Sequence, residues 1–121
     1  MALILIVDDS PTEVHVMQQA LERHGFETAA AADGAEAIEK ARSMQPDLIL
    51  MDVVMPGVNG FQATRKLAAD PLTRSIPVIM VTSKDQETDR IWGMRQGAVD
   101  YLVKPVSMDQ LVEKAQAALA G

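Results

Sequence analysis

The stretch Leu48-Ile-Leu-Met-Asp-Val-Val-Met-Pro-Gly57 decides how this chain folds. An apolar run, 48–51, leads directly to the acidic residue Asp52, and the turn signal Met55-Pro-Gly57 follows shortly afterwards. The run is too short for a helix of ordinary length, and unbroken apolar runs are typical of strands that are buried on both faces. The stretch therefore predicts an interior strand that ends at a carboxylate.

Two further runs of the same kind lie at Leu3–Val7 and Val78–Val81. Each is short, rich in branched side chains and bounded by polar or turn residues, so each predicts another buried strand. Weaker candidates at Phe26–Ala31 and Val99–Val103 bring the expected number of strands to five.

The segments between these strands carry apolar residues every three or four positions, as amphipathic helices do. The first should begin at Ser10-Pro-Thr-Glu13, where Ser10 caps the helix and Glu13 completes a capping box, and it should stop at Gly25. The others are expected over about 34–44, 61–68, 91–95 and 108–119. Alternating strands and helices predict a doubly wound α/β domain, with one parallel sheet covered on both faces.

Composition limits the classes of protein that need considering. The 121 residues, 48% of them hydrophobic, suffice for one core, so we expect one domain over 1–121. The absence of cysteine excludes disulfides and thiol nucleophiles, and a net charge of -6 argues against binding nucleic acid. The apolar N-terminus is too short for a signal peptide or membrane span, so we expect a cytoplasmic protein.

Polar residues follow four of the five expected strands. They are Asp8 with Asp9, Asp52, Thr82 and Lys104. In an open parallel sheet the functional crevice lies beyond the carboxyl ends of the strands, so these side chains should meet there. Gathered carboxylates raise one another's pKa unless a cation offsets their charge, and an all-oxygen set suits Mg²⁺.

The same constellation predicts phosphoryl transfer. A hydroxyl at Thr82 and an ammonium at Lys104 are donors that stabilise phosphoryl oxygens, which leaves Asp52 as the nucleophile. Taken singly, each of these residues would more often be structural: aspartates favour turns, and most lysines lie on the surface. Only their joint placement favours a functional site.

Four motifs resemble those of the response-regulator receiver family of two-component signalling: Val7-Asp-Asp-Ser10, Leu50-Met-Asp-Val-Val-Met-Pro-Gly57, Val81-Thr-Ser83 and Lys104-Pro105. The resemblance covers the whole chain. It implies a flavodoxin-like fold with strand order 2-1-3-4-5 and a stand-alone receiver without an output domain. Such a protein is not an enzyme in the usual sense, since it takes a phosphoryl group from a histidine kinase and loses it by autodephosphorylation.

The resemblance also implies individual roles. Asp52 is the expected phosphoacceptor, and Asp9 the principal Mg²⁺ ligand, assisted by Asp8, Asp52 itself and the backbone carbonyl of Val54. The remaining expected roles concern the response to phosphorylation: Thr82 and Lys104 contact the phosphoryl group, Thr82 moves toward it, and Tyr101 turns inward. Separately, the resemblance implies that the peptide bond before Pro105 is cis.

Three longer stretches resemble receivers that control twitching motility by type IV pili: 8–13, 57–65 and 84–93. This narrower likeness implies a chemotaxis-type histidine kinase as donor, a protein partner downstream, and a monomer or weak dimer. The sequence leaves open whether such a receiver docks on a target or acts as a phosphate sink.

Two other classes use a similar fold or nucleophile. A haloacid dehalogenase-type phosphatase would place Asp-x-Asp after the first strand, whereas Asp8 and Asp9 are adjacent and the expected acceptor follows the third. A flavin carrier would need phosphate-binding N–H groups where Asp8 and Asp9 would repel the phosphate. His15 and His24 lie nine positions apart, a spacing unsuited to a pair of metal ligands on one helix, so we expect both to be inert.

Overall fold

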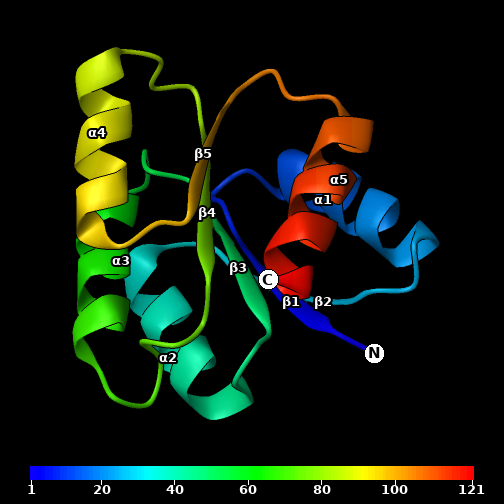
Figure 1. Ribbon diagram of the computed structural model, residues 1–121, viewed down its shortest axis with the longest axis horizontal. Coiled ribbons are helices and arrows are strands. Elements are labelled where there is room, and N and C mark those ends of the chain that lie inside the picture. The colour runs from blue at the N-terminus through cyan, green and yellow to red at the C-terminus, as the bar shows by residue number, and fades with distance from the viewer.

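The structure, a computed structural model, describes all 121 residues as a five-stranded parallel sheet between two layers of helices (Figure 1). The strands lie in the order β2-β1-β3-β4-β5, as predicted. Their bounds are β1 Leu3–Val7, β2 Glu27–Ala31, β3 Leu48–Met51, β4 Val78–Thr82 and β5 Asp100–Val103. The helices are α1 Pro11–Arg23, α2 Gly34–Met44, α3 Gly60–Ala69, α4 Glu87–Gln96 and α5 Met108–Ala120.

The predicted elements are all present, and their ends differ from expectation by a few residues at most. Strand β4 extends to Thr82, one residue beyond the predicted end. Strands β2 and β5 each begin one residue later than expected, which leaves Phe26 and Val99 outside the sheet. Buried apolar runs thus predict strands well, while the last residue depends on the ladder with the neighbouring strand.

The two faces of the sheet are covered by different helices. Figure 1 shows α1 and α5 on one side of the sheet and α2, α3 and α4 on the other. Alternate residues of each strand point to opposite faces, so Ile4 and Ile6 pack toward α1 and α5, whereas Leu5 and Val7 pack toward α2 and α3. This alternation makes two separate hydrophobic clusters, one on each face.

The helix starts follow ordinary capping chemistry, with one correction. Ser10 does cap α1, because its hydroxyl accepts a hydrogen bond from the Glu13 N–H at 3.3 Å. The predicted reciprocal contact from the Glu13 side chain is wrong. The Ser10 N–H donates instead to Asp8 Oδ1 at 2.9 Å, and the Glu13 carboxylate contacts Lys104.

The loop after β3 is held close to the start of α3. A Cβ atom added to Gly60 would lie 2.1 Å from the Asp52 carbonyl oxygen, a separation that real side chains do not tolerate. The Gly60 N–H also donates to the Val53 carbonyl at 3.0 Å. Glycine at position 60 therefore lets the loop turn back tightly, which holds the backbone of Asp52 against the first turn of a helix.

No helix in the structure has the length and apolar content that crossing a bilayer requires.

Candidate functional site

Strand register brings the expected site residues to one edge of the sheet. Val7 of β1 lies opposite Met51 of β3, and the Asp52 N–H donates to the Val7 carbonyl at 2.9 Å. Asp8 and Asp52 therefore leave neighbouring strands at the same level. At the same edge, on strands β4 and β5, the Lys104 N–H donates to the Thr82 carbonyl at 2.8 Å, so these two residues also lie together where neighbouring strands end.

Three carboxylates form a cluster at this edge. Asp8, Asp9 and Asp52 each offer an oxygen atom, and these three atoms lie within 4.8 Å of one another. Asp8 and Asp52 are 3% and 7% exposed, whereas Asp9 is open to solvent. Two of the three charges are therefore largely removed from water, a placement that is costly unless cations or hydrogen bonds compensate for it.

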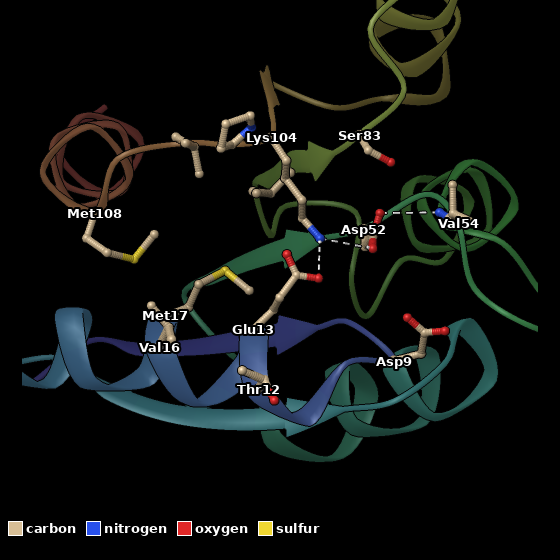
Figure 2. A pocket seen from close by; sticks show the side chains of 13 residues that line it. Asp9, Thr12, Glu13, Val16, Met17, Asp52, Val54, Ser83, Lys104 and Met108 are labelled. Atoms are coloured by element: carbon tan, nitrogen blue, oxygen red, sulfur yellow. Dashed lines mark hydrogen bonds and ion pairs between the residues drawn. The ribbon is translucent and has the colours of Figure 1, made fainter.

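Lys104 supplies one such compensation. Its Nζ donates to Asp8 Oδ2 at 2.8 Å, to Glu13 Oε2 at 3.1 Å and to Asp52 Oδ2 at 3.3 Å. Figure 2 shows the lysine side chain reaching across from its strand toward Asp52, with Glu13 beside its tip. The remaining Asp52 oxygen accepts a hydrogen bond from the Val54 N–H at 3.3 Å.

Burial and charge act against each other on the pKa of Asp52. Burial raises the pKa of Asp52, and the charge of Asp8 adds to that rise, while Lys104 and the Thr82 hydroxyl oppose it without cancelling it. For Lys104, burial alone would lower the pKa, but hydrogen bonds to Asp8 and Glu13 and the charge of Asp52 raise it well above its usual value. One ammonium shared by three carboxylates stays charged itself but leaves Asp52 incompletely compensated.

This donor set fits a hard divalent cation. All the side-chain ligands offered by Asp8, Asp9 and Asp52 are carboxylate oxygens, which Mg²⁺ prefers over nitrogen and sulfur. The incomplete compensation at Asp52 is a second reason, since a cation there would offset the charge that Lys104 leaves.

The cluster opens onto a surface cavity of about 640 Å³. Its polar wall includes Asp9, Asp52, Ser83 and Lys104, and its opposite wall is apolar and includes Val16 and Met108 (Figure 2). The Asp52 carboxylate thus faces a space large enough for a small phosphorylated group, while the strand that precedes it is buried.

The two expected switch residues lie on neighbouring strands near Asp52. Thr82 is fully buried, and its hydroxyl accepts a hydrogen bond from the Lys84 N–H at 3.3 Å. Tyr101 is 7% exposed and occupies an inward position, where its hydroxyl donates to the Lys84 carbonyl at 2.8 Å. Burial, together with the charge of Asp89, raises the pKa of Tyr101 to about 12. The movements of both side chains on phosphorylation stay predictions.

The remaining expected residues have simple surroundings. The Lys104–Pro105 peptide bond is cis. Val54 is 55% exposed and lines the cavity beside Asp52. His24 Nδ1 lies 2.9 Å from the Ala20 carbonyl within its own helix region, away from the carboxylate cluster.

Sequence reasoning missed Glu13 as part of the site. We assigned it to helix capping, whereas its carboxylate lies 3.1 Å from Lys104 Nζ. A signal was available, since Glu13 stands in the first turn of the helix that follows Asp8 and Asp9 and therefore near the same edge of the sheet. Nothing in the sequence, however, chose between the helix backbone and a lysine 91 positions away as its partner.

Residues 4–116 match the family model of the response regulator receiver domain, so the chain belongs to the receiver family of two-component signalling, as its motifs predict.

Within that family the chain is similar to PilH of Pseudomonas aeruginosa. The two are 56% identical over 121 residues, and the alignment covers all of both proteins. Response regulator PleD of Caulobacter vibrioides is 45% identical over 105 residues, which make up 87% of this chain but 23% of PleD. The likeness to PleD therefore concerns one part of a longer protein.

Solved structures agree with the fold. The chemotaxis protein CheY4 of Vibrio cholerae superposes with a TM-score of 0.92 at 33% identity, covering 98% of this chain and 99% of CheY4. The receiver domain of the sensor histidine kinase PA1611 of Pseudomonas aeruginosa has a TM-score of 0.91 at 32% identity, covering 99% of this chain and 98% of that one. That structure has a magnesium ion coordinated in its active site cleft.

Proposed function

We propose that this protein is a response regulator that accepts a phosphoryl group on Asp52 from a histidine kinase. The observation that carries the proposal is the joint placement of a buried carboxylate that lines a cavity, a lysine ammonium 3.3 Å from it and two further carboxylates in the same cluster. The Asp52 oxygen attacks the phosphorus atom, the bond from phosphorus to the kinase histidine nitrogen breaks, and its electron pair returns to the imidazole ring.

The chain's own residues position and stabilise this transfer. Lys104 holds Asp52 in place and presents a fixed positive charge to the phosphoryl oxygens. The Val54 N–H orients the acceptor through its second oxygen, and the Thr82 hydroxyl stands at the end of the adjacent strand to donate to the product. Asp8, Asp9 and Asp52, with the Val54 carbonyl, would hold Mg²⁺, which supplies positive charge to neutralise the phosphoryl oxygens when bound.

Chemical phosphorylation tests this proposal. Wild-type protein incubated with acetyl phosphate and Mg²⁺ should gain one phosphoryl group by intact mass, and the gain should disappear when Mg²⁺ is removed with EDTA. Asp52→Asn should show none. A matched control is Asp85→Asn, which removes an exposed aspartate in the loop after β4 and should label like wild type. Equal labelling of wild type and Asp52→Asn would exclude Asp52 as the acceptor.

We further propose a role in type IV pilus motility, which rests on full-length similarity to PilH. The expected donor is a chemotaxis-type histidine kinase of a pilus system. Transfer from such a kinase should be faster than transfer from kinases of unrelated pathways, measured with purified phosphorylated kinase domains. A faster rate from an unrelated kinase would contradict the pilus assignment.

Phosphorylation would be passed on by a change in protein binding at the surface near Tyr101, not by release of an enzymatic product. Apolar side chains lie exposed close to this residue in sequence, on α4 and at the end of β5: Ile91 at 42%, Trp92 at 49% and Val103 at 41%. Movement of the Tyr101 ring would alter the surface on which they stand. The only chemistry that remains for the protein itself is self-catalysed phosphotransfer and autodephosphorylation.

A further inference from the structure

Glu13 is the one partner of Lys104 that belongs neither to the acceptor nor to the carboxylate cluster. A lysine ammonium has three N–H donors, and three carboxylate oxygens lie within 2.8–3.3 Å of Lys104 Nζ. Every donor is therefore used while Asp52 is a free carboxylate. A phosphoryl group that needs this ammonium must displace one of the three contacts.

Local structure directs Glu13 to this position. In a capping box its side chain would bond the Ser10 N–H, but that donor is taken by Asp8 Oδ1 at 2.9 Å. The Glu13 side chain therefore extends from the first turn of α1 into the cavity wall, where Figure 2 shows it beside the tip of Lys104. It remains 47% exposed, whereas the side chains of Asp8 and Asp52 are 1% and 9% exposed.

The three contacts differ in what phosphorylation would do to them. Asp52 becomes the phosphorylated group, so its contact with Lys104 passes to the new phosphoryl oxygens. Asp8 would be drawn toward the metal, which offers it a stronger positive charge than one ammonium does. Glu13 has no other hydrogen-bond partner in the site, so as long as it holds Lys104 it leaves the phosphoryl group one donor fewer and adds a negative charge beside it.

We infer that Glu13 is a positioning residue that competes with the phosphoryl group for Lys104 and so restrains phosphorylation of Asp52. This inference rests on the proposed function and deepens it, because it names a regulator of the same site. The competition adds no chemical step: one charge-assisted hydrogen bond, from Lys104 to Glu13, is exchanged for another, from Lys104 to the phosphoryl group.

The test compares Glu13→Gln, which keeps the shape of the side chain and removes its charge, with Glu113→Gln, a matched control. Glu113 is an exposed glutamate on α5, so the control makes the same chemical change away from the site. The initial rate of labelling by acetyl phosphate with Mg²⁺ should rise about two- to five-fold in Glu13→Gln, as expected for loss of one partly exposed ion pair. In Glu113→Gln it should stay within about 1.5-fold of wild type.

A second readout does not depend on turnover. Beryllium fluoride binds aspartate carboxylates as a phosphoryl mimic, and its affinity with Mg²⁺ present can be followed by amide NMR. Glu13→Gln should bind it about two- to five-fold more tightly than wild type. If affinity and labelling rate are both unchanged in Glu13→Gln, Glu13 does not compete and the inference is wrong.

The Lys104→Ala background separates competition from simple repulsion of the anionic donor. If Glu13 acts through Lys104, adding Glu13→Gln to Lys104→Ala should leave the residual labelling rate unchanged. A rise equal to that in the wild-type background would mean that Glu13 repels the donor directly, which overturns the inference. Failure of the proposed function looks different, since wild type itself would then gain no phosphoryl group on Asp52.

Discussion

The centres of the strands and their carboxyl ends are built on opposite principles. Ile6 and Leu50 lie inside strands β1 and β3, are exposed by no more than 1%, and belong to one apolar cluster. Two residues further along the chain, directly after these strands, stand Asp8 and Asp52, which are nearly as well buried but acidic. The backbone hydrogen bonds of the sheet continue into both aspartates, since the Asp8 N–H donates to the Ala31 carbonyl at 3.1 Å and the Asp52 N–H to the Val7 carbonyl at 2.9 Å.

The strand centres stabilise the fold, and the carboxyl ends of the strands destabilise it. Apolar burial at the strand centres stabilises the fold by roughly 25 cal/mol for each Å² removed from water. At the carboxyl ends, burial raises the pKa of Asp52, which means that its charged form is less stable in the folded protein than in water. The rigid centres hold in place an edge that is unfavourable by itself, as functional sites often are.

The largest expected effect lies at a strand centre. Leu50→Ala should lower the free energy of unfolding by about 2–5 kcal/mol, because it leaves a cavity in a fully packed region. Urea unfolding at pH 7 measures the change. The control is Val99→Ala, at a residue that is 52% exposed, where the free energy of unfolding should fall by at most about 0.5 kcal/mol. Similar losses in both variants would contradict the division between core and surface.

A smaller loss is expected at Lys104. Lys104→Ala should lower the free energy of unfolding by about 1–3 kcal/mol without Mg²⁺, since it leaves Asp8 and Asp52 buried and without their cation. Millimolar Mg²⁺ should recover part of the loss, because a cation in the cluster offsets the same charge. Lys114→Ala serves as control: its ion pair with Asp100 is 38% and 39% exposed, so its loss should be at most about 1 kcal/mol.

Removing the charge of Asp52 should raise the stability of the fold rather than lower it. Asp52→Asn should raise the free energy of unfolding by about 1 kcal/mol at pH 7 without Mg²⁺, because it removes an incompletely compensated charge. The pKa of Asp52 is higher in the folded state, so wild type binds more protons when folded and loses stability as pH rises above 3.8, the ordinary value. The gain from Asp52→Asn should therefore vanish below about pH 3.8. Asp85→Asn, at an exposed site, should leave the free energy of unfolding at pH 7 within about 0.5 kcal/mol of wild type.

The smallest expected effect concerns the junction of α4 and β5. A Cβ atom added to Gly93 would lie 3.0 Å from Tyr101 Cδ2, so Gly93→Ala should push the ring toward solvent. Greater exposure should bring the pKa of Tyr101 down from about 12 toward its usual 10. Tyr101 is the only tyrosine, so ultraviolet titration of the phenol reads it directly. An unchanged pKa would mean that α4 shifts instead of the ring.

Much of the site could be predicted because its members follow strands. Asp8 and Asp52 come directly after buried apolar runs, Thr82 ends a third, and parallel strands carry their carboxyl ends to one edge. The prediction failed at Glu13, where two favourable partners were available. Its side chain could bond the helix backbone or Lys104, and which one it takes depends on Asp8 having already occupied the Ser10 N–H.

The sequence pattern also did not predict which side chains of α4 are exposed to solvent. Ile91 and Met94 lie in the predicted helix, but 42% and 37% of their surface is exposed, and Gly93 is the only buried residue of α4. A short helix with few inward apolar side chains has no strong amphipathic signal. The Tyr101 and Phe61 rings lie close to the helix at Gly93, a contact between distant parts of the chain that no local pattern predicts.

The alternation of strands and helices and the parallel sheet can be read from the sequence, since they depend on local apolar runs and on chain connectivity. The acidic and basic residues that follow the strands can be read from it too. How the one ammonium of Lys104 is shared among three carboxylates at 2.8, 3.1 and 3.3 Å is seen in the tertiary structure alone. The physical reason is distance along the chain: these partners lie up to 96 residues apart, and no local pattern records which oxygen atoms compete for the same proton donors.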